Sequence, residues 1–151
     1  MNSCGWEPDD PRFEDEVSYV KDLKTLTLKI TASQKKVVRG ANVVFYVIKS
    51  GTANVVGRRF SDFVWLRDVF KRLYGGMLLP PMPKKELIVD DATVELRRVG
   101  LESYLKMLAK NPYLRDDVIF RKFIRAEAST WAGLRAQEIE DLANNEAFIS
   151  N

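Results

Sequence analysis

The most conspicuous gap in this sequence of 151 residues is histidine, which is absent, while cysteine occurs only once, as Cys4. Without histidine there is neither a histidine-based triad nor a Cys–His pair. Zinc sites of the usual kind are excluded for the same reason. A single cysteine cannot form an internal disulfide, which fits a reducing cytosol. We therefore expect no enzyme, no metal site and no cofactor.

Glycine-rich loops and long apolar runs are also missing. None of the eight glycines falls in a G-x-G-x-x-G or G-x-x-x-x-G-K-[ST] arrangement, so nucleotide-binding loops have no candidate. The longest apolar run, residues 41–48, is interrupted by Asn42 and is far shorter than the roughly 18–20 residues that span a bilayer. The N-terminus is acidic where a signal peptide would be basic, so no export signal is expected.

Charge is distributed unevenly along the chain. The net charge is +3, but residues 1–22 sum to −5 and residues 126–151 to −4, which leaves +12 on residues 23–125. So basic a central region favours an anionic partner such as phospholipid, nucleic acid or an acidic protein. We expect an acidic flexible segment over residues 1–19, one domain over 20–126, and a linker or helical tail over 127–151.

Three segments in the first half of the chain read as β-strands. Residues 23–30 alternate between apolar and polar side chains, as in a half-buried strand. After a basic connection over residues 31–40, a β-branched and aromatic run covers 43–49, and a short third strand follows around 54–56. The pattern predicts a three-stranded antiparallel sheet.

Helical periodicity begins at Ser61 or Asp62 and continues to Gly75-Gly76, where glycine ends the helix. A proline-rich loop, residues 79–85, reads as a stiff extended segment. Further helices are expected over residues 93–110 and 116–125, and a weaker pattern covers 131–148. The fold class is therefore α+β, with the sheet packed against a helical subdomain.

Three separated motifs, in this order, carry a resemblance. They are R-R-F-S-D-F at 58–63, P-P-x-P-x-K at 80–85 and R-x-x-G-L-E-x-Y-L at 97–105. Together with the strands and helices between them, they resemble the Phox-homology (PX) domain, especially as found in sorting nexins, over residues 20–126. The resemblance implies the PX fold and a basic pocket for phosphoinositides, most often phosphatidylinositol 3-phosphate.

The resemblance also implies the site residues. Arg59 would contact the 3-phosphate, Phe60 would pack along the inositol ring, and Lys85 would contact the 1-phosphate. Arg97 would contact the ring hydroxyls; its spacing to Leu101 and Tyr104 independently places it on the buried stripe of its helix.

Several neighbouring residues receive secondary roles. Arg58 and Lys84 are expected to be auxiliary electrostatic contributors, although Arg58 could equally be an ordinary solvated arginine. Leu87, Ile88 and Val89 are candidates for shallow membrane insertion, or alternatively for packing into the fold.

We therefore expect a cytoplasmic, non-enzymatic membrane-targeting module, peripheral on the cytosolic face of endosomal membranes, that recognises phosphatidylinositol 3-phosphate and serves protein sorting. The alternative is a protein-interaction module with little lipid specificity, docking to a sorting complex or offering the P-x-x-P-x-K segment to SH3 domains. Nucleic acid is not expected as a partner, because no stacking face of aromatic and basic residues is evident.

Overall fold

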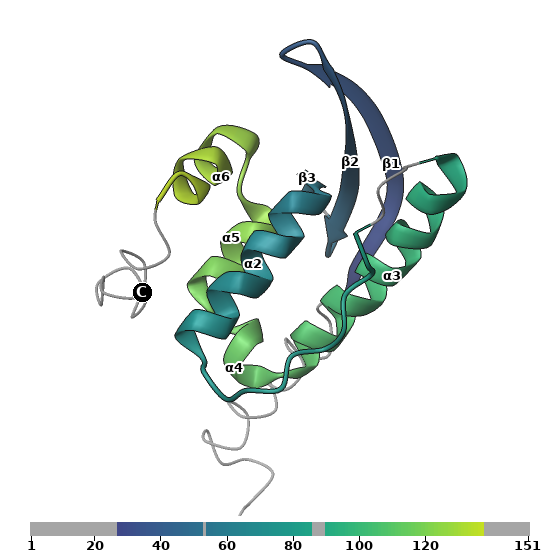
Figure 1. The fold of residues 1–151 in the computed structure, drawn as a ribbon. Helices are drawn as coiled ribbons and strands as arrows, with labels where there is room; N and C mark the ends of the chain where they lie inside the picture. Colours follow the sequence, from purple (N-terminus) through teal and green to yellow (C-terminus); the bar gives the residue numbers. More distant parts are fainter. Residues whose placement is uncertain (1–26, 53, 86–89, 138–151) are drawn as a thin grey trace, which may run out of the picture.

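A three-stranded antiparallel sheet and five helices make up the part of the chain that the structure, a computed structural model, describes: residues 27–52, 54–85 and 90–137. Strands β1 (Leu28–Val38), β2 (Ala41–Ser50) and β3 (Asn54–Arg59) lie in the order β1-β2-β3. The helices pack beside the sheet (Figure 1). The predicted α+β fold is confirmed.

The β1–β2 hairpin is longer than the sequence pattern predicts. Residues 31–38, expected in a connecting loop, continue β1 and pair with β2 up to a turn at Arg39 and Gly40, whose φ angles are 50° and 78°. A bulge between Ile30 and Ala32 shifts the register, and every residue from 31 to 42 is exposed. Because neither face of this part is buried, its sequence lacks the alternation by which a strand is recognised.

Three of the described helices lie within about two residues of the predicted ranges, and the short helix at 112–115 was not predicted. The helices are α2 (Phe60–Leu73), α3 (Asp91–Lys110), α4 (Pro112–Arg115), α5 (Val118–Arg125) and α6 (Ala128–Arg135). The Asp90 carboxylate accepts from the backbone N of Thr93 at the start of α3, and Asp117 accepts from two backbone N–H groups of α5. Among these helices, none has the length and hydropathy that crossing a membrane requires.

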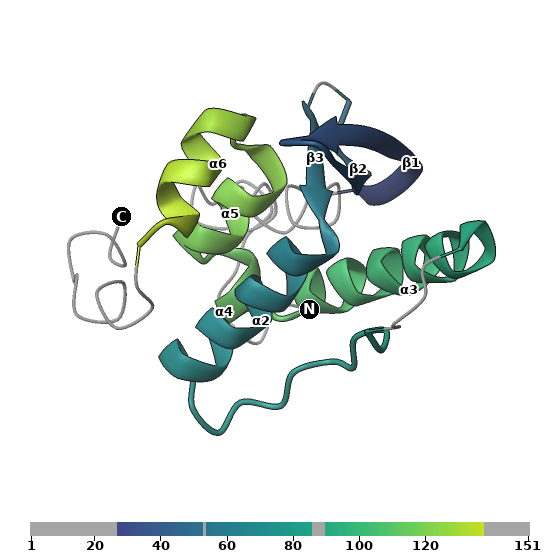
Figure 2. The ribbon, with the colours of Figure 1, turned by 45° about the horizontal axis from the view of Figure 1, so that its top comes forward.

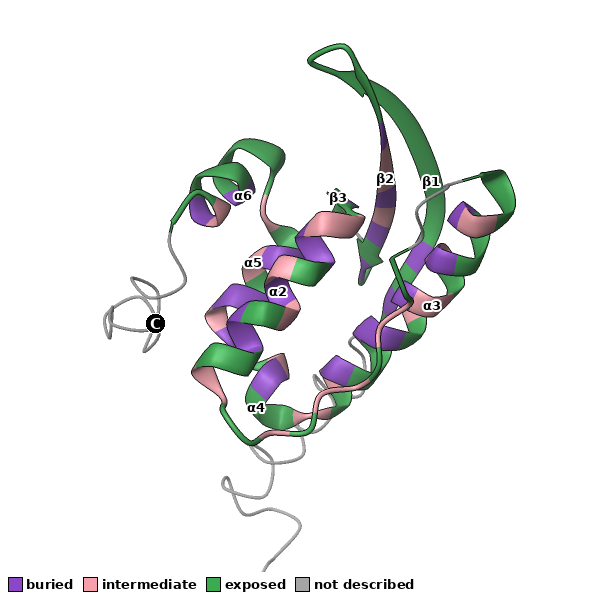
Figure 3. Cartoon of the chain, in the orientation of Figure 1, coloured by how far each residue is buried: buried purple, intermediate pink, exposed green. Residues whose placement is uncertain are grey.

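One hydrophobic core joins the sheet to the helices. In Figure 3 the buried faces of α2 and α3 point inward, whereas the far end of the hairpin is exposed on both sides. α6 begins before the predicted residue 131 and belongs to this core, since Trp131 and Leu134 are each only 5% exposed. Residues 138–148 of the predicted tail helix lie outside the described residues. The core is built from Leu28, Ile30, Tyr46, Ile48, Phe63, Leu66, Val69, Phe70, Leu101, Tyr104, Leu105, Leu108, Phe120, Phe123, Ile124, Trp131 and Leu134, among others.

Helix α3 is fixed along the outer edge of β1 by its own side chains. The backbone N of Ile30 donates to Glu102 Oε1 at 2.9 Å, and Arg98 Nη1 donates to the Ile30 carbonyl at 2.7 Å. These bonds occupy edge groups of the strand just before the bulge. They set the position of α3 relative to the sheet, and with it the position of Arg97.

The proline-rich segment crosses from the end of α2 to α3 without helical structure (Figure 2). Arg67 Nη1 donates to the Pro80 carbonyl at 2.5 Å. At Gly100 of α3, an added Cβ would lie 2.6 Å from Pro83 Cγ, which shows how closely the segment approaches the helix. Because Pro83 packs closely on α3, the position of Lys85, two residues further along, is fixed relative to that helix.

Candidate functional site

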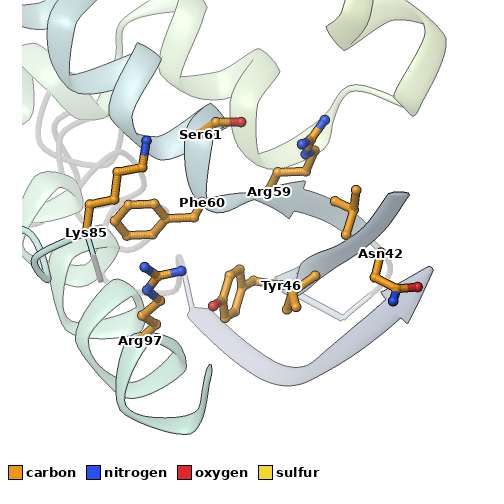
Figure 4. A pocket seen from close by; sticks show the side chains of 9 residues that line it. Asn42, Tyr46, Arg59, Phe60, Ser61, Lys85 and Arg97 are labelled. Carbon is orange, nitrogen blue, oxygen red and sulfur yellow. The ribbon is translucent and has the colours of Figure 1, made fainter. Parts of the chain in front are cut away.

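A cavity of about 330 Å³ opens where β2, the end of β3, the start of α2, the proline-rich segment and α3 meet (Figure 4). We call it the headgroup cavity. All four residues implied by the resemblance, Arg59, Phe60, Lys85 and Arg97, line it. The other lining residues are Asn42, Val43, Val44, Tyr46 and Ser61.

Phe60 forms the middle of the cavity. It is the first residue of α2, and its ring lies between the side chains of Lys85 and Arg97 in Figure 4. The guanidinium carbon of Arg97 is 4.3 Å from the ring centroid, within the range of a cation–π contact. This contact holds the Arg97 guanidinium against the ring of Phe60 on the wall of the cavity.

Arg97 is anchored at the edge of the core, as its helical spacing predicts. It is 7% exposed, and the Tyr46 hydroxyl points towards it from β2 (Figure 4). Burial raises the pKa of the Tyr46 phenol, and the charge of Arg97 offsets part of that shift. The arginine is therefore held in one place on the cavity wall.

Arg59 is exposed at the last position of β3. Its backbone N donates to Asp62 Oδ2 at 2.7 Å, which fixes the turn from strand to helix. Its guanidinium is directed away from Phe60, Lys85 and Arg97 in Figure 4. Arg59 thus lies at the rim of the headgroup cavity, and a change of rotamer is needed to bring its guanidinium inside.

The structure overturns the expectation for Arg58, which is neither solvated nor part of the headgroup cavity. It is 1% exposed and lies opposite Tyr46 on the core face of the sheet. Its guanidinium donates to the carbonyls of Phe123 (2.9 Å), Lys122 (3.3 Å), Gly57 (3.0 Å) and Ala126. Burial lowers its pKa to about 10, and the Asp62 carboxylate partly offsets this effect.

The strand pattern contains the signal for this difference. Successive side chains of a strand point to opposite faces, so Arg58 and Arg59 cannot share an environment. The sequence does not reveal the distant partners of Arg58, which are backbone carbonyls at and just after the end of α5. For the same reason the sequence did not predict that Tyr46 lines the cavity, because its place there follows from the β2–β3 register.

Of the secondary residues, Lys84 is exposed but does not line the headgroup cavity. Leu87, Ile88 and Val89 lie outside the described residues. In the described ranges, which omit 1–26, 53, 86–89 and 138–151, no group of acidic and cysteine side chains is arranged to hold a metal ion.

The packing of the proline-rich segment bears on the SH3 alternative. Pro80 and Pro83 are half-buried, and Pro83 lies against Gly100 of α3. A P-x-x-P ligand must lay its prolines in an aromatic groove of the partner. The segment would have to leave α3 to do so, and the geometry does not favour this reading.

Comparisons with known proteins agree with the fold. The family model described as the PX domain matches residues 46–127. Sorting nexin 1 of Arabidopsis thaliana is 35% identical over 92 residues, covering 58% of this chain and 23% of that protein. The vacuolar protein sorting-associated protein vps5 of Schizosaccharomyces pombe is 38% identical over 74 residues, covering 48% of this chain and 13% of that protein.

A solved structure supports the same conclusion. The X-ray structure of a designed CISK-PX domain aligns with a TM-score of 0.61 and 30% identity, covering 67% of this chain and all of that one. The fold and the match to the family model show that the chain belongs to the PX domain family. It spans less than a quarter of the length of the two sorting proteins above.

Proposed function

We propose that this protein binds phosphoinositides through the headgroup cavity and thereby attaches to membranes, with phosphatidylinositol 3-phosphate on endosomes as its preferred lipid and protein sorting as its role. One observation carries the proposal: Phe60, flanked by Lys85 and Arg97, forms a cationic and aromatic cavity with Arg59 at its rim. The names of the two related sorting proteins support the assignment to membrane traffic.

The chemistry of these side chains suits a phosphorylated sugar ring. A guanidinium offers a planar fork of donors that engages phosphate through two hydrogen bonds, whereas an ammonium acts as a point charge. The Phe60 face offers an apolar surface for the ring, and Arg97 is held beside it where hydroxyls would lie. Such an arrangement discriminates between headgroups as well as attracting them.

Charge alone would not suffice for stable attachment. Each basic residue near an anionic bilayer contributes on the order of 1 kcal/mol, so a few of them give only about millimolar binding. Charge-assisted hydrogen bonds add about 1.5–3 kcal/mol each. Specific phosphate contacts in the cavity are therefore required for selective membrane binding.

The test is co-sedimentation of the intact chain with vesicles that contain one phosphoinositide each, across the singly and multiply phosphorylated series, at physiological salt. Two variants remove the same charge: Arg59→Ala at the cavity rim and Arg125→Ala, an exposed arginine at the end of α5. Thermal melting checks that both remain folded.

We expect selective binding to the 3-phosphate lipid, weakened roughly 10- to 100-fold by Arg59→Ala and little changed by Arg125→Ala. Equal binding to every anionic vesicle, with both variants losing the same small amount, would show that net charge alone acts. The protein-interaction alternative would then become the better explanation.

A further inference from the structure

A second cavity, of about 380 Å³, lies on the other side of Arg59. We call it the α6 cavity, because α6 forms one wall and the outer face of β2 and β3 forms the other. Phe45, Gly57, Arg59, Trp131, Ala132 and Arg135 are among its lining residues. Arg59 is shared with the headgroup cavity, whereas Phe60, Lys85 and Arg97 do not line the α6 cavity.

The walls of the α6 cavity are largely apolar. On the sheet side, the Phe45 side chain covers Gly57, with its Cβ 3.6 Å from the position that a Cβ of Gly57 would take. On the helix side, Trp131 and the methyl groups of Ala128, Ala132 and Ala136 face the cavity, since residues four apart share one side of a helix. A bulky apolar side chain would fit between these two surfaces.

The rim of the cavity is cationic. Arg59 is exposed, and in the part of the chain that the structure describes its guanidinium has no hydrogen-bond acceptor or ion-pair partner. Arg135 pairs with the Asp62 carboxylate and also donates to Ser61 Oγ at 3.2 Å. At this rim Arg59 and Arg135 are set against the single carboxylate of Asp62, which leaves a net charge of +1, whereas the guanidinium of Arg58 is buried among backbone carbonyls.

From this combination we infer that the α6 cavity is a docking site for an acidic peptide of a partner protein. One bulky apolar side chain of the peptide enters between Phe45 and Trp131, and a neighbouring carboxylate meets Arg59. Apolar burial supplies binding energy, and the charge-assisted contact supplies orientation. The site is additional to the lipid-binding function proposed above.

A lipid headgroup suits this cavity less well than a peptide does. An inositol or glycerol group would press its hydroxyls against Phe45, Trp131 and alanine methyl groups, where they would find few partners. Burying polar groups without hydrogen bonds costs free energy. The apolar walls therefore favour an apolar side chain with an acidic neighbour.

The experiment follows the backbone amide of Gly57 and the indole N–H of Trp131 by NMR in the intact chain. The probe is a short synthetic peptide with a leucine between glutamates, compared with one in which serine replaces the leucine and one in which lysines replace the glutamates. Ala132→Leu fills the cavity. Thr130→Leu adds the same side chain to α6 at an exposed position that does not line it.

We expect saturable shifts of both signals with the glutamate–leucine peptide, an affinity at least roughly 10-fold lower in Ala132→Leu, and no change in Thr130→Leu. Both control peptides should bind more weakly. If Ala132→Leu does not fold, Ala136→Leu tests the same wall. Binding of the Ala132→Leu variant to phosphoinositide vesicles should persist, which separates this site from the headgroup cavity.

Three outcomes would overturn the inference. They are the absence of saturable shifts, equal binding by the filled variant, and equal binding of the serine peptide. If anionic vesicles lacking phosphoinositides shift these two signals while the peptide does not, the cavity is a lipid site and the peptide assignment is wrong.

Discussion

Two adjacent arginines at the end of β3 have separate tasks. Arg58 is buried and ties the sheet to the end of α5, whereas Arg59 is exposed between two cavities. Substitutions at these two positions should therefore affect different properties of the protein. At Arg58 we expect loss of stability, and at Arg59 loss of binding.

Arg58→Lys tests the structural task. Lysine keeps the charge but lacks the planar fork, so it leaves several of the four carbonyl acceptors of Arg58 unpaired in the core. We expect the free energy of unfolding to fall by about 2–4 kcal/mol, measured by urea denaturation. Arg59→Lys, at an exposed position, is the matched control and should change it by less than about 0.5 kcal/mol. Equal effects at both positions would contradict the assignment.

Gly100 in α3 and Gly133 in α6 allow a second comparison, of the same glycine-to-alanine substitution at two helical positions. Gly100→Ala places a methyl group against Pro83, whose ring cannot turn aside, so we expect a cost of about 1–3 kcal/mol that exceeds the gain in helix propensity. Gly133 in α6 has no atom within 4 Å of an added Cβ. There alanine should stabilise the protein by about 0.5–1 kcal/mol.

Gly100→Ala should also weaken vesicle binding, because displacing Pro83 moves Lys85 relative to Phe60. Denaturation and co-sedimentation of the same two variants measure both effects. A Gly100→Ala protein that matches Gly133→Ala in both measurements would show that the proline-rich segment moves freely on α3.

Among the elements, α2 and α5 are joined at their ends by a partly buried hydrogen bond. The Tyr74 hydroxyl, just after α2, donates to Asp117, which also caps α5. Burial raises the pKa of the Tyr74 phenol, and the hydrogen bond and the negative charge of Asp117 raise it further. The folded state therefore retains the Tyr74 proton at a pH where the unfolded chain has released it.

The pH dependence follows from this difference. Because the folded pKa lies above the ordinary value of 10.0, the stabilisation is complete below that pH and is lost as the pH rises through the folded pKa. Tyr74→Phe should be less stable by about 0.5–1.5 kcal/mol at neutral pH. The gap should narrow above about pH 10, by no more than about 1.4 kcal/mol per pH unit.

Urea denaturation of both proteins over a pH series checks this expectation. The opposite effect of Arg58, whose lowered pKa of about 10 favours the folded state as the pH rises, is present in both and cancels in the comparison. A gap that stays constant from neutral to strongly alkaline pH would mean that Tyr74 titrates alike in both states.

Sequence periodicity identified the elements with a buried face and failed where no such face exists. α2 and α3 begin within about two residues of their predicted starts, because each has an apolar stripe and an aspartate near its start that accepts from a backbone N–H. The exposed half of β1 was not predicted as a strand, because its apolar and polar residues do not alternate. Sequence motifs predicted four of the residues that line the headgroup cavity: Arg59, Phe60, Lys85 and Arg97. The place of Tyr46 and the α6 cavity could not be predicted in this way, because they depend on packing between segments far apart in sequence.

At the scale of the whole molecule, the positive charge of the central region is partly offset by the negative charge of the two terminal segments. Residues 23–125 carry +12 and residues 1–22 carry −5. Replacing the acidic residues of 1–22 by their amides keeps the length and removes the negative charge. We expect stronger binding to phosphatidylserine vesicles at low salt, because unscreened repulsion from the vesicle surface is removed.

The gain should disappear at about 0.5 M salt, where screening is short-ranged, and a salt series of co-sedimentation measures it. Selectivity between phosphoinositides should stay the same, since it depends on the headgroup cavity. A gain that persists at high salt would indicate that the acidic segment covers the binding surface by direct contact.

The hydrogen bonds of Arg58 also have a consequence for synthesis. Three of its acceptors lie 64 to 68 residues further along the chain. At the usual pace of translation, roughly 3 to 14 s pass between the addition of Arg58 and that of Ala126. During that interval the strands can pair locally, but the arginine on their inner face lacks these acceptors. A ribosome that stalls before residue 126 would hold a nascent chain able to form its hairpins and unable to close its core.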